Sequence, residues 1–188
     1  MKMRTDNRQY EGEADIFSLD YEGRGVARVN GKALFIEGAM PGERVRFEII
    51  RSKKQFDEAR VIDIIRYSEN RVEPKCRYFD TCGGCSIQHI DSTAQIAFKQ
   101  RIMEEQLERI GKIRPKQILP AIYGTPWHYR ERARLSISKD AGGRLKIGFK
   151  AKKSHEVIDV DSCMVLPAHI SEKLQKIKQM LQSLIDLD

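Results

Sequence analysis

The residues best suited to chemistry in this chain are its four cysteines, because thiolates bind metals and act as nucleophiles. Cys76, Cys82 and Cys85 lie within ten residues, and Cys163 follows 78 residues after Cys85. No secretory signal segment is visible at the N-terminus, so we expect a cytoplasmic protein, whose cysteines bind metal more often than they form disulfides. If one inorganic centre gathers all four cysteines, residues 76–163 form one closed structural unit.

The spacing of the cysteines favours an iron–sulfur cluster over a zinc ion or unliganded thiols. Zinc sites usually take cysteines as two close pairs, whereas three clustered cysteines with a remote fourth are closer to iron–sulfur proteins. Only Cys82 and Cys85 form a close pair here. Gly83 and Gly84 allow the backbone to bend around a cluster and to aim N–H groups at its sulfur atoms. If the centre uses every thiol, none remains as a nucleophile, and no complete active site is visible.

A concentrated basic segment is the second candidate site. The net charge of the chain is +7, and residues 130–153 contain nine Lys or Arg against two acidic residues. Arg130, Arg132 and Arg134 alternate along a strand predicted over residues 130–138, so they share one face of it. Arginine forks onto phosphates and stacks on bases, which favours RNA contact over an ordinary solvated face. The predicted RNA-binding residues are Arg130, Arg132, Arg134, Phe149 and Lys150.

Two predicted domains, residues 1–67 and 68–188, position these residues. The first is predicted to contain five short strands, beginning with residues 11–19 and including a hairpin at Asn30-Gly31. This pattern indicates a five-stranded β-barrel of the oligonucleotide-binding type. The second domain mixes helices and strands and contains all four cysteines, so the predicted fold class is α+β.

Two helices are predicted in the second domain. The first covers residues 92–110, and its apolar stripe, which includes Ile96, Met103 and Leu107, is predicted to be core rather than a partner surface. The second covers the residues from Pro167 to the end of the chain, with apolar residues at steps of three or four.

A smaller cationic and aromatic group lies in the predicted barrel, where Arg51, Lys53 and Lys54 accompany Phe56. Such a group suits contact with RNA backbone and base, but it equally suits a solvated hairpin tip. The barrel is not basic as a whole, because ten Lys or Arg residues face eleven acidic residues between positions 10 and 67.

Several motifs match one known family. They are Cys76-x5-Cys82-Gly-Gly-Cys85, Gln88-His89, the run from Pro126 to Ser136, Gly148-Phe149 and Val157-x-Asp159-x3-Cys163. Together they resemble the bacterial 23S ribosomal RNA uracil-5-methyltransferases of the RumA kind, and the N-terminal barrel resembles the TRAM domain of those enzymes.

The resemblance implies that Cys76, Cys82, Cys85 and Cys163 hold a [4Fe–4S] cluster that serves folding and RNA docking. It implies 23S rRNA as the partner, gripped by both domains. The complete enzymes transfer a methyl group from S-adenosylmethionine to C5 of uracil. In them a cysteine adds to C6 and a carboxylate removes the C5 proton, both within a C-terminal domain to which no residue here corresponds.

We therefore expect the RNA-recognition portion of such an enzyme, a monomer without membrane association, catalytic residues or activity by itself. S-adenosylmethionine would be bound only by the full-length enzyme. The alternative is a stand-alone iron–sulfur module that binds RNA or senses redox state.

Overall fold

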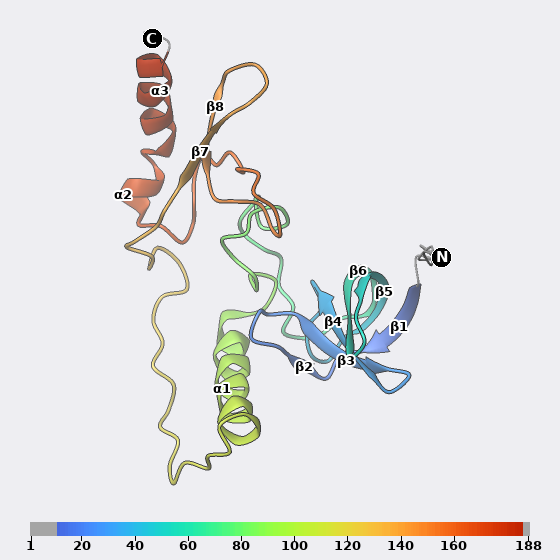
Figure 1. Ribbon diagram of the computed structural model, residues 1–188. Helices are drawn as coiled ribbons and strands as arrows, with labels where there is room; N and C mark the ends of the chain where they lie inside the picture. The colour runs from blue at the N-terminus through green and yellow to red at the C-terminus, as the bar shows by residue number, and fades with distance from the viewer. Residues whose placement is uncertain (1–10, 186–188) are drawn as a thin grey trace, which may run out of the picture. The chain divides into compact units, whose positions relative to one another are not determined.

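The computed structural model describes residues 11–185, and Figure 1 shows its elements. The chain divides into two compact units, each assembled from two segments. Unit 1 comprises the described residues up to Val72 together with His89–Ala121. Unit 2 comprises Glu73–Gln88 together with the described residues from Ile122 onward.

A six-stranded sheet forms most of unit 1 (Figure 1). Its strand order is β1-β5-β6-β4-β3-β2, and the neighbouring strands are antiparallel except for the parallel pair β4 and β6. The strands are β1 (Glu11–Asp15), β2 (Ser18–Leu19), β3 (Gly25–Val29), β4 (Lys32–Glu37), β5 (Arg44–Ser52) and β6 (Phe56–Arg66).

The first predicted strand is divided into β1 and β2, so the prediction of five strands was wrong by one. The division has a local cause. The Ile16 N–H donates to the carbonyl of Glu43 at 2.8 Å, whereas the Phe17 N–H donates to the carbonyl of Val26 at 3.1 Å. Successive residues therefore bond to different neighbours, and the chain passes from β5 to β3 at this point.

Alternation of buried and outward side chains builds the core of the sheet. Leu34 and Ile36 of β4 pack with Val45 and Phe47 of β5 and are almost completely buried. The predicted hairpin at Asn30-Gly31 joins β3 to β4, and both residues have the positive φ angles, 50° and 78°, that such a two-residue turn requires. The large sheet together with the helices confirms the α+β class.

The segment that follows β6 is anchored to the sheet by a buried ion pair. Glu43 is 0% exposed, and its carboxylate accepts hydrogen bonds from the backbone N–H of Met40 and from the guanidinium of Arg71. Next to Arg71, the Val72 N–H donates to the carbonyl of His89 at 3.0 Å. These contacts hold the beginning of the predicted linker within unit 1.

Helix α1 (Ser92–Arg109) also lies in unit 1, and its predicted bounds are confirmed. The Asp91 carboxylate caps it by accepting from the backbone N–H of Thr93 at 2.9 Å. The prediction that its apolar stripe is core was wrong, since none of its residues is buried in the described part of the chain. Sequence periodicity identified the apolar face correctly but could not show what covers it. Among residues 11–185, no helix combines the length and apolar character needed to cross a membrane.

Unit 2 contains a short hairpin, β7 (Ser136–Lys139) and β8 (Leu145–Gly148), followed by α2 (Ala168–Ser171) and α3 (Leu174–Ile185). Helix α3 is fastened to β8 through Asp159, which bonds both the Ile147 N–H at 3.0 Å and the Lys178 ammonium at 2.7 Å. The single C-terminal helix that was predicted is therefore two helices.

The prediction of a strand beginning at Arg130 was wrong, because the ladder with β8 begins only at Ser136. The preceding residues bond elsewhere. The N–H groups of His128 and Arg130 donate to the carbonyls of Met164 and Val165, at 2.9 and 2.8 Å. The arginines thus lie on an extended segment, bonded at Arg130 to the chain around Cys163, and not on one face of a sheet strand.

Candidate functional site

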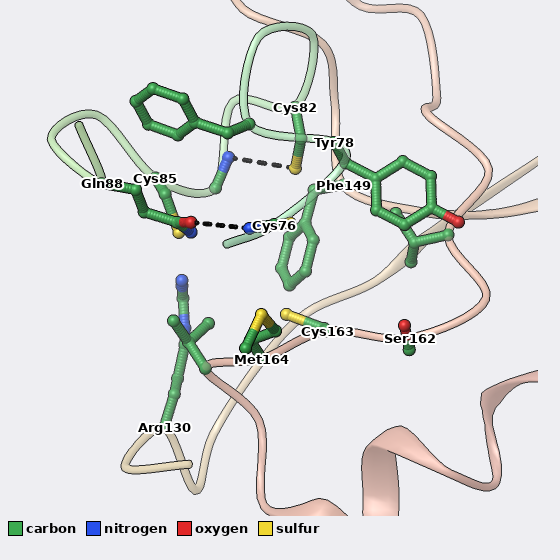
Figure 2. A pocket seen from close by; sticks show the side chains of 14 residues that line it. Cys76, Tyr78, Cys82, Cys85, Gln88, Arg130, Phe149, Ser162, Cys163 and Met164 are labelled. Carbon is green, nitrogen blue, oxygen red and sulfur yellow. Dashed lines mark hydrogen bonds between the residues drawn. The ribbon is translucent and has the colours of Figure 1, made fainter. Parts of the chain in front are cut away.

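All four cysteines line one pocket of unit 2, together with Arg130 and Phe149 (Figure 2). Three of them come from the loop Cys76–Cys85, and Cys163 comes from the segment between β8 and α2. None of the four forms a disulfide. The structure thus brings the remote fourth cysteine to the other three. The prediction that residues 76–163 form one closed unit was wrong, because His89–Ala121 belong to unit 1.

Backbone hydrogen bonds shape the cysteine loop. The Phe79 N–H donates to the carbonyl of Cys76 at 3.0 Å, and the Cys82 N–H donates to the carbonyl of Tyr78 at 2.7 Å. The Gly84 N–H points at the Cys82 Sγ, 3.4 Å away. These turns direct one amide toward sulfur, which is the arrangement that stabilises negative charge on a metal-bound thiolate.

Gly83 lets the loop lie directly against the chain that follows β8. Its N–H donates to the carbonyl of Lys150 at 2.9 Å, and a Cβ at this position would lie 2.8 Å from the same oxygen. Cys82 also forms an isolated β-bridge with Ala151. The loop and the segment at Lys150 are therefore held together by backbone contacts that only glycine at position 83 permits.

Cys163 is held in place by residues outside the cysteine loop. Its N–H donates to the Ser171 Oγ at 2.8 Å, and it packs against the small core formed by Val160, Leu166 and Leu174. The role of Ser171 was not predicted. A serine eight residues away in a short helix gives no sequence signal of such a contact.

The thiols influence one another electrostatically. Burial raises the pKa of Cys76, and the neighbouring thiols of Cys163 and Cys85 raise it further, against a backbone hydrogen bond from Tyr78. Burial likewise raises the pKa of Cys82, where the Gly84 amide acts in the opposite direction. The raised pKa values favour the protonated thiols of Cys76 and Cys82 at neutral pH, and metal binding would displace these two protons.

Four thiols around one pocket are a suitable donor set for an iron–sulfur cluster. However, no group of three or more His, Cys, Asp or Glu side chains within residues 11–185 has the arrangement that holds a metal ion. The structure therefore does not confirm the predicted cluster, which stays a prediction.

The predicted RNA-binding residues divide into two sets. Arg130 lines the cysteine pocket, where its guanidinium carbon lies 5.5 Å from the centre of the Phe149 ring (Figure 2). Arg132 and Arg134 are exposed on the extended segment that follows, and Lys150 is exposed beside the cysteine loop. Arg130, Phe149 and Lys150 are thus close to the cysteines, whereas Arg132 and Arg134 do not line the pocket.

Further polar residues of the cysteine loop and of the segments that contact it were missed by sequence reasoning. Tyr78 lines the pocket, and the Tyr78 hydroxyl accepts from the Asp161 N–H at 3.1 Å. Arg77 donates to the Asp161 carboxylate at 2.6 Å, and its guanidinium lies over the Tyr78 ring. Lys152 adds a cation 4.3 Å from the centre of the Phe79 ring. Their ordinary residue types and large sequence separation gave no signal.

The cationic and aromatic group of the sheet is partly engaged within unit 1. The Lys53 ammonium lies 4.8 Å from the centre of the Phe56 ring, and that ring packs edge-on against Phe35. Arg51 forms a bidentate pair with Glu58, with both distances 2.8 Å. The charge of Arg51 is therefore largely compensated, which leaves Lys53, Lys54 and Phe56 as the available part of the group.

Comparison with known protein families identifies the domain that the sheet of unit 1 forms. Residues 11–62, which include all six strands except the last residues of β6, match the model of the TRAM domain. The sheet of unit 1 is thus the TRAM domain that the sequence predicted.

Relatives resemble the chain over most of its length. The chain is 60% identical over 173 residues to the "23S rRNA (uracil(1939)-C(5))-methyltransferase RlmD" of Neisseria lactamica (strain 020-06), which covers 92% of this chain and 38% of the relative. It is 49% identical over 172 residues to the enzyme of the same name from Azoarcus sp. (strain BH72), covering 91% of this chain and 40% of that one. The predicted resemblance to the uracil-5-methyltransferases of 23S rRNA is confirmed, although the chain spans only about two fifths of these relatives' length.

A solved structure shares the fold. The crystal structure of Pyrococcus abyssi tRNA (uracil-54, C5)-methyltransferase in complex with S-adenosyl-L-homocysteine matches with a TM-score of 0.60 at 24% identity. The match covers 91% of this chain and 37% of that one.

Proposed function

We propose that this chain is the RNA-binding, cluster-holding portion of an S-adenosylmethionine-dependent 23S rRNA uracil-5-methyltransferase. The observation that carries the proposal is the single pocket that four cysteines share with Arg130 and Phe149 (Figure 2). The names of the relatives support the RNA substrate and the reaction. We expect the protein to act in the cytoplasm, as a monomer.

The cysteines would hold a [4Fe–4S] cluster, since Cys76, Cys82, Cys85 and Cys163 supply four thiolates and the Gly84 amide already points at sulfur. When bound, the cluster would supply a rigid cross-link between the loop and the segment around Cys163. We assign it no part in methyl transfer.

The RNA-binding face would consist of Arg130, Arg132, Arg134, Phe149 and Lys150. Both ends of this set are bonded to the cysteine segments, because the Arg130 N–H donates to the carbonyl of Val165 and the Lys150 carbonyl accepts from Gly83. The cysteine centre therefore fixes the spacing between the arginine segment and the aromatic ring. Arginine and an aromatic ring side by side suit a phosphate and an unstacked base of single-stranded RNA.

Methyl transfer itself we place in the part of such enzymes that lies outside the region of similarity. That part would bind S-adenosylmethionine and carry the catalytic residues. Residues 1–188 by themselves are then expected to bind RNA without methylating it.

The RNA-binding proposal is tested by replacing Arg132 and Arg134 together with alanine. Affinity for a 23S rRNA fragment should fall roughly tenfold or more, and the salt dependence of binding should become shallower by about one unit of slope for each lost phosphate contact. Lys99→Ala on α1 is the control of equal charge type and should bind as the wild type does. Unchanged affinity of the double variant would return this segment to the interpretation as a solvated charged face.

The second candidate is a stand-alone iron–sulfur module that binds RNA or senses redox state. It rests on the same pocket of four cysteines and on the nearby Arg130 and Phe149. The genomic sequence after codon 188 discriminates the two, because an in-frame methyltransferase continuation supports the first candidate and its absence supports the second.

A further inference from the structure

A second hollow of unit 2 borders the cysteine pocket. It is a groove of about 400 Å³, within the range of about 300–1,000 Å³ that sites for small ligands occupy. The groove shares four of its lining residues with the cysteine pocket, namely Cys76, Tyr78, Ser162 and Met164 (Figure 2). The others are polar or charged, and they are Lys75, Arg77, Asp161 and Gln175. We name this hollow the Lys75 groove, and all of its lining residues belong to unit 2.

Hydrogen bonds hold the wall of the groove that contains Tyr78. The Asp161 N–H donates to the Tyr78 hydroxyl oxygen at 3.1 Å, and the hydroxyl donates to the Asp161 carboxylate at 3.2 Å. Nη2 of Arg77 donates to both the hydroxyl and the carboxylate, at 2.6 Å each. Because these groups already have fixed partners, little conformational freedom is lost when a ligand binds against them. The wall is therefore preorganised.

Arg77 can still bind a ligand from this position. Its guanidinium carbon lies 4.8 Å from the centre of the Tyr78 ring, and its side chain is 65% exposed. Both of its bonds to the wall use Nη2, whereas a guanidinium carries five N–H donors. Guanidinium groups donate to phosphate oxygens and stack on bases, so Arg77 suits both parts of a nucleotide.

Lys75 gives the groove a positive charge that no carboxylate compensates. Its exposed ammonium lies 5.7 Å from the centre of the Trp127 ring, and none of the ion pairs within residues 11–185 includes it. The carboxylate of the groove, Asp161, is in contrast already bonded by Arg77 and lies 3.7 Å from the Lys178 ammonium. The charge available to a ligand is thus positive, which suits an anion.

Gln175 of α3 adds an exposed amide to the groove. An amide offers one acceptor and two donors, which can pair with the edge of an unstacked base. A cation for phosphate, a guanidinium plane for stacking and an amide for a base edge are the groups that recognise single-stranded RNA. A protein partner suits the groove less, because the centres of protein interfaces are depleted of charged residues.

We propose that the Lys75 groove binds one nucleotide of single-stranded RNA, with its phosphate on Lys75 and Arg77 and its base against Arg77 and Gln175. The inference rests on the proposed function and adds these three residues to the RNA contacts. Because the groove and the cysteine pocket share Cys76 and Tyr78, this nucleotide lies beside the one held at Arg130 and Phe149. The RNA strand therefore continues along the cysteine loop into the groove.

RNA binding by variants of the anaerobically purified chain tests the groove. Lys75→Ala combined with Gln175→Ala should weaken binding of a 23S rRNA fragment roughly tenfold or more and make the salt dependence shallower by about one unit of slope. Lys75→Arg keeps the charge and should bind as the wild type does. Lys176→Ala is the matched control, since this exposed lysine follows Gln175 on α3 without lining the groove. All of these side chains are exposed, so Tm by circular dichroism should stay at the wild-type value.

The outcomes separate this inference from the proposed function. If the Lys75 and Gln175 double variant binds as the wild type does while the Arg132 and Arg134 double variant binds weakly, the groove is rejected and the proposed function stands. An equal loss of affinity in Lys176→Ala would also reject the groove, because any nearby charge would then have the same effect. If the wild-type chain binds no RNA, the proposed function and the groove are both rejected.

Discussion

Gly83→Ala is the perturbation that most directly examines how the cysteine loop is held. A Cβ at this position would lie 2.8 Å from the Lys150 carbonyl oxygen and 3.3 Å from that of Ala151. Both neighbours are backbone atoms, so no side-chain rotation can relieve the contact. The loop has to move away, and the 2.9 Å hydrogen bond from the Gly83 N–H to Lys150 is weakened or lost.

The size of the effect follows from these two contributions. Loss of the hydrogen bond costs about 1 kcal/mol. Accommodation of an extra methyl group in a packed site costs about 1–3 kcal/mol. The free energy of unfolding of unit 2 should therefore fall by about 2–4 kcal/mol.

Urea unfolding followed by tryptophan fluorescence measures this change, because Trp127 is the single tryptophan in the sequence and lies in unit 2. The measurement uses protein purified under anaerobic conditions. Gly124→Ala is the matched control, since a Cβ there has no neighbour within 4 Å, and its unfolding free energy should stay within about 0.5 kcal/mol of the wild type. Equal stabilities of Gly83→Ala and wild type would refute the close packing of the loop on residues 150–151.

Two further changes test the supports of each unit. Arg71→Ala leaves the buried Glu43 carboxylate without its guanidinium, so unit 1 should lose about 3–5 kcal/mol of stability in thermal unfolding followed by circular dichroism. A loss below 1 kcal/mol would show that the pair is not buried in solution. Burial raises the pKa of Asp159, but Lys178, the Ile147 N–H and Arg144 together outweigh burial and hold the pKa of that carboxyl below its usual range. Asp159 therefore stabilises unit 2 above its unfolded-state pKa of about 4, and this contribution is lost as the pH falls through the lower folded-state pKa. Lys178→Met should flatten that acid dependence in urea titrations between about pH 6 and 3, and an unchanged dependence would contradict the assignment.

Features set by neighbouring residues could be predicted from the sequence. The Asn30-Gly31 hairpin, the strands with alternating burial and the bounds of α1 depend on short-range geometry, and the structure has them where they were predicted. The gathering of Cys163 with the other cysteines also followed, because the chemistry of a four-thiol site demands it.

The failures arise where distant contacts decide the local structure. The residues from Arg130 have the alternation of a strand, but His128 and Arg130 bond to the chain after Cys163 instead of extending the hairpin. The stripe of α1 has the periodicity of a core helix, but periodicity shows only that a face is apolar. It does not show whether this chain or another domain buries that face.

Anaerobic iron and sulfide analysis of the purified chain tests the central claim most directly, namely that Cys76, Cys82, Cys85 and Cys163 hold one iron–sulfur cluster. The account predicts brown protein with about four iron and about four sulfide per chain. Colourless protein with one zinc per chain, or with no bound metal, would contradict it.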